Sequence, residues 1–393
     1  MSVGGAIMGY VGDKYGRKTA LELSVFLMAF PTFAMGCLPS YDMVGPWAIY
    51  MLAAVRILQG LSVGGQLVSS LVFTVESRPK DQWGLYGSYV MATANFGTLL
   101  GGVVGLTLRA ILTYEQLRSW GWRIPFLSGV LVSLSGFYLK YHVEEDDHGS
   151  IGASIKNPIW ETFQPGNLRP LLSVSLVPML WSGGFYLTFV WMAIFMGDLL
   201  DPPIPAAFGI NSLALFMSVC LLFPLAGILS DWYGRDRIMT IGGVSMGLLS
   251  PIMIAIIATG NPVGAFFAQC AMGIFLCLWG APMTAWMVES FPPAARLTSV
   301  AIGYNIAQMT AGGFAPALAT FCVDRYGIHS PGYILTALAI LSLVGLKIAP
   351  PKRYGMEQME LLHNGNENPR EERLLQENSK YGSMPESETR TVE

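Results

Sequence analysis

Long apolar stretches without a charged side chain alternate with short polar segments along this chain of 393 residues. Runs that lack Asp, Glu, Lys and Arg include 82–108, 171–197 and 297–323, and residues 238–288 form another, broken at Thr259-Gly260-Asn261-Pro262. A helix needs about 20 predominantly apolar residues to cross the hydrocarbon core of a bilayer. Only helices and closed barrels satisfy their backbone hydrogen bonds there. The pattern therefore predicts an all-α membrane protein.

We expect eleven membrane-spanning helices, the first of them incomplete. Their predicted ranges are 1–12, 19–38, 46–75, 84–110, 124–141, 170–197, 207–230, 238–258, 262–288, 297–322 and 329–349. These ranges predict an N-terminal bundle at 1–142, a central loop at 143–169 and a C-terminal bundle at 170–349. The polar residues 350–393 are predicted to form a disordered tail, because they are too poor in apolar side chains to build a core.

A charged turn of the pattern G-x-x-x-D-x-x-G-R occurs twice, at 9–17 and at 227–235. A second matching feature follows each copy: Glu76-Ser-Arg-Pro79 ends one apolar run and Glu289-Ser-Phe-Pro292 ends another. Because two features recur in the same order and at similar spacing, we expect two parallel halves related by an axis along the membrane normal. In such proteins the solute is held near the midplane, between the halves.

The distribution of Lys and Arg predicts which ends of the helices face the cytoplasm. When both charged turns are assigned to the cytoplasm, the outer loops contain only four of these residues: Arg109, Arg118, Arg123 and Arg325. An excess of Lys and Arg marks the cytoplasmic side of a membrane protein. The sequence therefore predicts an integral multi-pass protein, of the plasma membrane, with a cytoplasmic tail and the lipid bilayer as its surroundings.

Composition argues against several other classes of protein. Charged residues make up 12% of the chain, against about 25% in soluble proteins, and no basic patch supports nucleic-acid binding. The five Cys lack the paired spacing of a metal site, and no G-x-x-x-x-G-K-[ST] loop of an ATP-driven pump is present. No nucleophile–base pair is visible. We expect no enzyme activity, no cofactor and no metal.

The charged turns resemble the conserved cytoplasmic loop of the major facilitator superfamily. Within it, Arg56-Ile-Leu-Gln59-Gly60-Leu-Ser62-Val-Gly64-Gly65 and Trp120-Gly-Trp122-Arg123-Ile-Pro125 are similar to the metabolite–proton symporter family. That family transports proline and betaine, or organic acids. The resemblance implies two pseudo-symmetric helical bundles and twelve helices, of which the first is expected to be missing here. It also implies protons as a co-transported partner.

Arg56 is the one Lys or Arg deep within a predicted span, where a cation normally faces a polar cavity because it is costly in lipid. Gln59, Gln66 and Ser70 share its helix face. We expect Arg56 to contact a solute carboxylate; the alternative is packing against backbone carbonyls. The family commonly has an acid where this chain has Gln66, and Gln cannot take up a proton, so proton coupling follows from the resemblance alone.

Other polar and aromatic side chains within the spans are candidates for solute contact. Asn95 shares a helix face with Ser88 at seven-residue spacing, and in the matching helix Asn305 shares one with Thr298, with Gln308 a turn away. These amides can bond a solute or another helix. Aromatic residues can form a cation–π wall for a quaternary ammonium group, or serve only for packing: Tyr186, Trp191, Trp279 and Trp286.

Seven charged residues at predicted cytoplasmic helix ends form a candidate gate: Asp13, Arg17, Glu76, Asp231, Arg235, Glu289 and Arg296. Opposite charges on adjacent loops can pair in one conformation and separate when two halves rock. The alternative is static pairing at a solvated rim, where a pair contributes only about 0–1 kcal/mol.

The leading hypothesis is a secondary active transporter, a proton symporter of a small organic solute such as an organic acid, proline or betaine, that works by alternating access. One alternative is a transporter-like solute sensor that signals through its tail. Another is a sugar-type facilitator.

Overall fold

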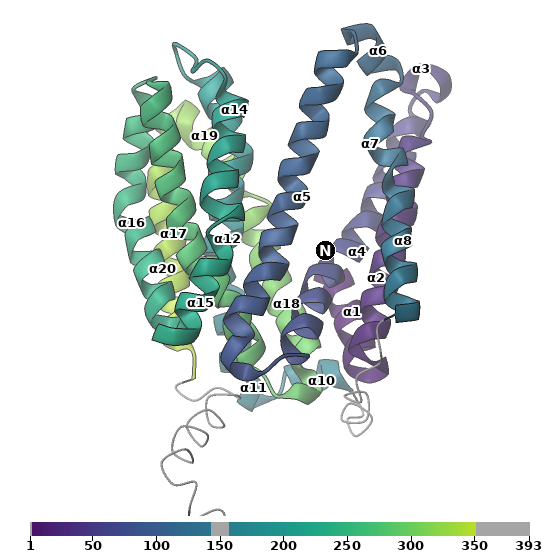
Figure 1. The fold of residues 1–393 in the computed structure, drawn as a ribbon, viewed down its shortest axis with the longest axis vertical. Helices are drawn as coiled ribbons and strands as arrows, with labels where there is room; N and C mark the ends of the chain where they lie inside the picture. The colour runs from purple at the N-terminus through teal and green to yellow at the C-terminus, as the bar shows by residue number, and fades with distance from the viewer. Residues whose placement is uncertain (1, 143–156, 351–393) are drawn as a thin grey trace, which may run out of the picture. The chain divides into compact units, whose positions relative to one another are not determined.

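The computed structural model describes residues 2–142 and 157–350, and the regular elements in these ranges are all helices (Figure 1). Ten of them are long and apolar enough to cross a membrane, which confirms the predicted all-α membrane fold. Met1–Pro351 forms one compact unit. The predicted tail and most of the predicted central loop lie outside the described residues, and the division into two bundles, loop and tail stays a prediction.

The first half, residues 2–142, contains five helical segments that run along the bundle, joined by short helices. The long segments are α1 (Ser2–Tyr15), α2 (Arg17–Gly36), α4 (Trp47–Glu76), α5 (Trp83–Ile111) and α7 (Ile124–Leu127) followed by α8 (Gly129–His142). The connecting helices are α3 (Tyr41–Val44), η1 (Lys80–Gln82), α6 (Tyr114–Ser119) and η2 (Gly121–Arg123).

The second half, residues 157–350, begins with the short α10 (Pro158–Thr162). A first span follows as α11 (Pro165–Leu176), α12 (Pro178–Phe185), η3 (Tyr186–Trp191), α13 (Met192–Ile194) and η4 (Phe195–Leu199). The next spans are α14 (Ala207–Ala214) with η5 (Leu215–Cys220) and α15 (Phe223–Tyr233), then α16 (Arg235–Ala258) and α17 (Pro262–Glu289). After η6 (Pro293–Ala295) the chain continues as α18 (Arg296–Ala307), η7 (Gln308–Gly312), α19 (Ala315–Tyr326) and α20 (Ser330–Ile348).

The predicted ranges agree with these bounds to within about one helical turn at most ends. The largest difference is at α11, which begins at Pro165 rather than at residue 170. Proline is favourable in the first turn of a helix because it has no N–H to leave unpaired. The span predicted at 1–12 corresponds to α1, whose 14 residues extend about 21 Å at 1.5 Å per residue.

Both charged turns have the same backbone geometry. Gly16 separates α1 from α2 with φ 106°, and Gly234 separates α15 from α16 with φ 92°. A positive φ with extended ψ is accessible to glycine and strained for other residues. The chain therefore reverses within one residue, which brings the end of one helix beside the start of the next.

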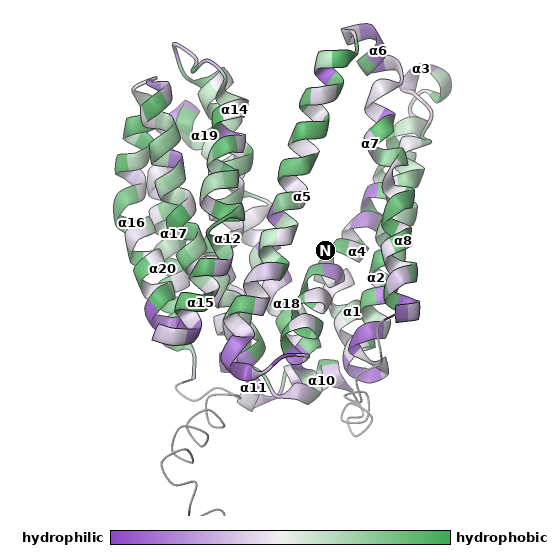
Figure 2. Cartoon of the chain, in the orientation of Figure 1, coloured by the Kyte–Doolittle hydropathy of each residue, from purple (hydrophilic) through white to green (hydrophobic). Residues whose placement is uncertain are grey.

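The two halves repeat one packing scheme. In the first half α2 packs against α1, α4 and α8; in the second half α16 packs against α15, α17 and α20. Polar residues gather at the chain reversals at either end of the helices, and apolar residues cover their lengths (Figure 2). We call the end that carries both charged turns the turn end.

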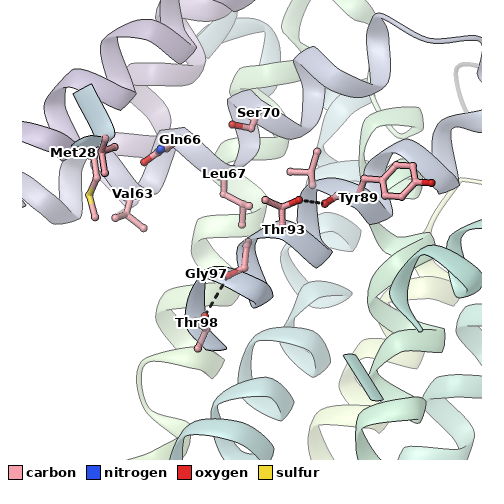
Figure 3. A pocket seen from close by; sticks show the side chains of 12 residues that line it. Met28, Val63, Gln66, Leu67, Ser70, Tyr89, Thr93, Gly97 and Thr98 are labelled. Atoms are coloured by element: carbon pink, nitrogen blue, oxygen red, sulfur yellow. Dashed lines mark hydrogen bonds between the residues drawn. The ribbon is translucent and has the colours of Figure 1, made fainter. Parts of the chain in front are cut away.

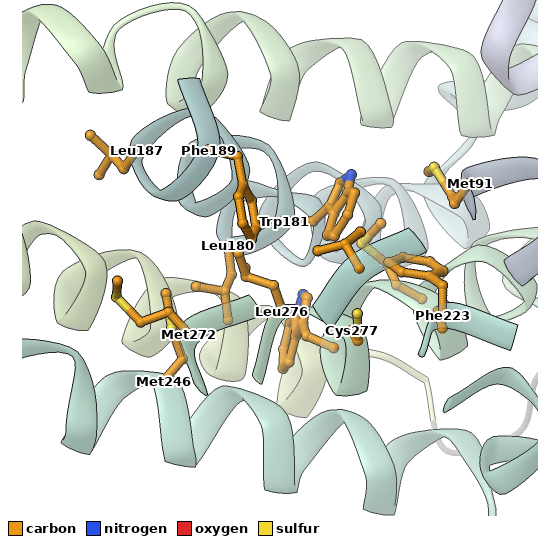
Figure 4. Packing of buried hydrophobic residues seen from close by; sticks show 14 of the residues in the cluster. Met91, Leu180, Trp181, Leu187, Phe189, Phe223, Met246, Met272, Leu276 and Cys277 are labelled. Carbon is orange, nitrogen blue, oxygen red and sulfur yellow. The ribbon is translucent and has the colours of Figure 1, made fainter. Parts of the chain in front are cut away.

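The second half contains most of the apolar core. Leu180, Trp181 and Phe223 pack beside Met272 and Leu276 of α17 (Figure 4). Half of an apolar 18-residue stretch of α17 is buried inside the protein. The share is 22% for a stretch of the same length in α4, the counterpart of α17 in the first half. The first half thus leaves more of its helix surface uncovered by described residues.

Candidate functional site

The first charged turn connects the two halves. Asp13, in the last turn of α1, bonds Arg17, the first residue of α2. The Asp13 carboxylate also accepts the backbone N–H groups of Leu297 at 3.2 Å and Thr298 at 2.7 Å, at the start of α18 in the second half. The first N–H groups of a helix have no acceptor within the helix, and its N-terminal end favours an anion. Asp13 therefore caps a helix of the other half.

The second charged turn also connects the halves, with an aspartate of the second half capping a helix of the first. Arg235 Nη1 donates to Asp231 Oδ1 at 2.6 Å. Asp231 accepts the backbone N–H groups of Gly84 and Leu85, each at 2.9 Å, at the start of α5 in the first half. Each half thus supplies one aspartate and one helix N-terminus to the other, and four backbone donors are satisfied across the halves.

The two glutamates of the predicted gate differ in what they join. Glu76 accepts Nε of Arg17 at 3.0 Å and Nη1 of Arg296, in the second half, at 2.7 Å. Glu289 accepts Nε of Arg235 at 2.6 Å, within its own half. Arg17 also donates to the carbonyl of Pro293 in the second half, at 2.7 Å.

Cross-half contacts therefore fall into two seams. The first seam joins α1 and α4 to α18. It includes the Glu76–Arg296 ion pair and the bond from Arg17, at the start of α2, to Pro293 of η6. The second seam joins α5 to α15 and α17. Its charged groups include Asp231, which caps α5, and Lys80 of the first half, which lies close enough to Glu289 of the second half for the two charges to interact.

These charges are not at a solvated rim. The seven side chains of the predicted gate have relative exposures of 12% or less. Breaking one partner from a buried pair is strongly destabilising, by about 3–5 kcal/mol, because the other charge is left uncompensated. The structure thus brings all seven residues together, in two buried clusters at the turn end.

The capped residues also define the alignment of the first half with the second. Gly84 corresponds to Leu297 and Leu85 to Thr298, at the same spacing of 213 positions that separates Glu76 from Glu289.

The same spacing places the buried amides in the repeat. Asn95 corresponds to Gln308, and Asn305 corresponds to Ala92. The two asparagines therefore lie on matching helices but three positions apart in the repeat.

A cavity of about 1050 Å³ lies within the first half, between α4, α5 and α8 (Figure 3). None of its lining residues is charged: Met28, Val63, Gln66, Leu67, Ser70, Tyr89, Val90, Thr93, Ala94, Gly97, Thr98 and Val132. Thr93 and Thr98 donate to backbone carbonyls of their own helix. Gln66 and Ser70 lie four residues apart on α4 and have no side-chain hydrogen bond to any described residue, so they remain available to a solute.

The cavity occupies a defined position in the repeat. In the second half the span α11 to η4 packs against α17, α18 with η7 and α19, and α20. The corresponding helices of the first half are α4, α5 and α8, which line the cavity. Among the described residues, the cavity therefore lies where the second half has the span α11 to η4.

The polar stripe predicted on α4 is present, with Arg56 and Gln59 outside the cavity. Arg56 is exposed and donates from Nη1 to Gln59 Oε1 at 3.3 Å. Gln59 is buried and donates to Thr32 Oγ1 of α2 at 3.1 Å. Of the predicted solute contacts, Gln66 lines the cavity.

The buried amides bond to backbone carbonyls. Asn95 donates to Met91 of its own helix at 2.8 Å. Asn305 donates to Gly64 of the first half at 2.7 Å and to Ala301 of its own helix at 2.8 Å.

The aromatic candidates do not form a wall around the cavity. Trp279 and Trp286 have no exposed surface, and Trp191 donates to Thr320 Oγ1 within the second half. Tyr186 is half-buried and lies near Gln308, since both side chains lie close to Gly312. Tryptophan is large and apolar enough for burial to be favoured over solvent contact, which explains why its position in a span does not predict exposure.

Sequence reasoning missed the groups that the aspartates bind. The donors of the caps are backbone N–H groups, such as those of Gly84 and Leu297, and residue type does not identify them. The available signal was position, because each glutamate is followed within about eight residues by the start of the capped helix. In residues 2–142 and 157–350 no cluster of three His, Cys, Asp or Glu side chains could hold a metal ion.

Ten apolar spans in two repeated halves, joined by reciprocal charged caps, define a multi-pass helical transporter. Residues 1–296 and 204–358 match the Major Facilitator Superfamily, and the chain belongs to this superfamily.

Relatives and solved structures agree with this assignment. A Staphylococcus aureus (strain COL) protein, named provisionally as a proline/betaine transporter, is 30% identical over 359 residues, which cover 87% of this chain and 74% of that protein. The inner membrane metabolite transport protein YhjE of Escherichia coli is 29% identical, over 90% of this chain and 82% of its own. The proton:xylose symporter XylE bound to 6-bromo-6-deoxy-D-glucose shares the fold, with a TM-score of 0.74 at 18% identity over 90% of this chain and 85% of that structure. The family recognised from the sequence is confirmed, and its members are transporters rather than enzymes.

Proposed function

We propose that this transporter moves a small organic zwitterion or monocarboxylate, such as proline, betaine or a small organic acid, by alternating access. The observation that carries the proposal is the pair of reciprocal caps at the turn end. They hold the two halves together there, whereas no hydrogen bond or ion pair between described residues joins the halves at the opposite end. Figure 1 shows α5 and α14 diverging away from the turn end.

The turn end is a gate in this proposal, and the charged clusters are its latch. For a solute to leave through the turn end, Asp13 and Asp231 must release the helix ends that they cap, and Glu76 must separate from Arg296. Hydrogen bonds to charged groups contribute about 1.5–3 kcal/mol each, and water replaces part of this when the latch opens. Two conformations that differ by a few kcal/mol are the requirement for alternating access. The excess of Lys and Arg in the segments at the turn end supports a cytoplasmic position for this gate.

Arg56 and Gln66 are proposed to contact the solute one after the other rather than at the same time. They are ten residues apart on α4, about 15 Å at 1.5 Å per residue, which is longer than proline or betaine. Arg56 is on the side away from the turn end, so it attracts a carboxylate at the entrance. Gln66 and Ser70 then bond the solute within the cavity. The names of the relatives support this class of solute.

Proton symport is the proposed coupling, and it rests on the family resemblance. No acid lines the cavity, and the buried acids of the described ranges lie in the latch. That uncharged lining favours a second candidate, a facilitator that equilibrates its solute without protons.

Uptake by the purified protein in proteoliposomes tests both candidates. Radiolabelled proline, betaine and 2-oxoglutarate are supplied with and without an inward proton gradient. Symport predicts accumulation above equilibrium that requires the gradient; a facilitator predicts equilibration that is independent of it. The Gln66→Leu variant is expected to lower uptake at least tenfold, and Gln164→Leu, at an exposed site outside the cavity, to leave it unchanged. No uptake of any of the three solutes would contradict the proposed solute class.

A further inference from the structure

We propose that Asn305 locks the first seam, so that its bond to Gly64 must break before the turn end opens. This inference rests on the proposed alternating access. Of the two roles expected from the sequence for Asn305, a bond to a solute or to another helix, it takes the second. Asn305 Nδ2 donates to the Gly64 carbonyl at 2.7 Å, and the side chain is 2% exposed. The bond joins α18 of the second half to α4 of the first, one turn or more inside the charged caps at Leu297 and Thr298.

Glycines make the close approach around this bond possible. A Cβ at Gly5 would lie 2.3 Å from Asn305 Nδ2, and a Cβ at Gly65 would lie 2.2 Å from Cβ of Met8. Both distances are below van der Waals contact, so α1, α4 and α18 meet at a point where only glycine fits. A small displacement of α18 therefore breaks the bond rather than stretching it, which is how a lock with two discrete states behaves.

The acceptor of the lock lies on the same turn of α4 as a residue that lines the cavity. Gly64 lies two residues before Gln66, which lines the cavity. A solute that bonds Gln66 thus acts on the helix that supplies the acceptor of the lock. The charged latch lies at the turn end, so the molecule has two successive closures on the path: the amide lock beneath the cavity and the charged latch beyond it.

The second seam has no equivalent lock. In the alignment set by the caps, Ala92 takes the place of Asn305, and alanine has no side-chain donor. Asn95, one turn further along α5, donates to Met91 of its own helix. This makes Asn95 a matched control: it is the same residue type, 5% exposed, in the corresponding helix, and its bond to Met91 stays within α5.

Hydrogen exchange of the purified protein, without solute, tests the lock. The backbone amides at 84–85 and 297–298 are protected by the caps and report opening of the turn end. Asn305→Ala is expected to raise their exchange rates about fivefold, the factor that corresponds to one buried hydrogen bond. Gly5→Ala displaces the Asn305 amide by a different route and is expected to raise the same rates. Asn95→Ala is expected to leave them unchanged.

Exchange in α16, residues 239–254, serves as the reference for general loss of stability. Unchanged exchange at both caps in Asn305→Ala would overturn the lock. An equal rise in α16 would also overturn it, because the residue would then act only in packing. Hydrogen exchange is measured without solute, so its outcome does not depend on the uptake experiment. The lock can be contradicted while solute uptake is observed, and it can be supported while no uptake is found.

Discussion

Single glycines determine the geometry of the charged turns. Gly16 and Gly234 have φ values of 106° and 92°, and this reversal places Asp13 beside Arg17 and Asp231 beside Arg235. Each residue of the repeated motif therefore has its own role. The glycine allows the chain to reverse, the arginine bonds the aspartate, and the aspartate caps a helix of the other half.

Gly234→Ala tests this role of the turn. No atom lies within 4 Å of a Cβ built at this position, so the substitution introduces backbone strain without a clash, about 1–3 kcal/mol. The melting temperature of the purified protein is expected to fall. Gly166→Ala is the control, because Gly166 also has open space around it and has an ordinary φ. Equal melting temperatures for the two variants would show that the turn tolerates a side chain.

The charged residues of the gate could be predicted from the sequence, because an unpaired charge at a helix end needs a partner and the motif occurs twice. Their cross-half partners could not. Backbone donors at Gly84 and Leu297 carry no chemical mark in the sequence, and the burial of Trp286 depends on which helix packs over it.

Helical elements with π geometry are found in the second half: η3, η4, η5 and η7. A π segment interrupts the regular i to i−4 bonds and leaves carbonyls for other donors. In η3 the carbonyl of Thr188 accepts Nε2 of Gln269 at 2.6 Å, and that of Phe189 accepts Nδ2 of Asn211 at 2.9 Å. Side chains of α14 and α17 thus support the irregular backbone of the first span of this half.

Asn211→Leu is expected to destabilise the second half. It leaves the Phe189 carbonyl without its donor and removes one acceptor of Gln269, and an unsatisfied buried polar group costs about 1–3 kcal/mol. The measurement is thermal unfolding in detergent. Gln164→Ala, which removes an exposed bond to Glu161, is the control and should unfold within about a degree of the parent. If both variants unfold alike, the π segment does not depend on Asn211.

The spans themselves were predictable at this scale, because runs without charge define where a helix crosses the membrane. The π segments were not, since helices that are apolar on all sides have no periodic pattern in which an inserted residue would be visible.

The whole molecule is held closed at the turn end by unequal seams. Glu76 bonds arginines of both halves, Arg17 and Arg296, whereas Glu289 bonds Arg235 of its own half. Glu76→Gln removes the charge that both arginines face and is expected to favour opening of the turn end. Glu289→Gln weakens the attraction to Lys80 of the first half but leaves the Asp231 caps in place, and it is expected to have a smaller effect on opening.

Distances between spin labels measure this difference. Labels at Tyr15 of α1 and Trp232 of α15, both exposed at the turn end, report the separation of the halves. Glu76→Gln is expected to increase the population of long distances at least threefold over Glu289→Gln. Equal populations in the two variants would show that the seams contribute alike.

The orientation of the molecule in the membrane is a further prediction. A cysteine at Trp232, which is 75% exposed at the turn end, is expected to react with a membrane-impermeant maleimide only after the cells are permeabilised. A cysteine at Tyr114, which is 74% exposed at the opposite end, is expected to react in intact cells. The parent protein, with the exposed Cys37 replaced by Ser, gives the background from the other four cysteines, which is subtracted. The reverse labelling pattern would place the turn end outside.

The reciprocal caps have a consequence for assembly. Each half carries both an anion and a helix end that receives one, so on this feature alone a half is complementary to itself as well as to its partner. Two copies of either half could, by their caps, form an isologous pair. The bonds of Glu76 to Arg296 and of Asn305 to Gly64 belong to the first seam, and such a homotypic pair would lack them. These bonds therefore favour pairing of the first half with the second over pairing of two identical halves.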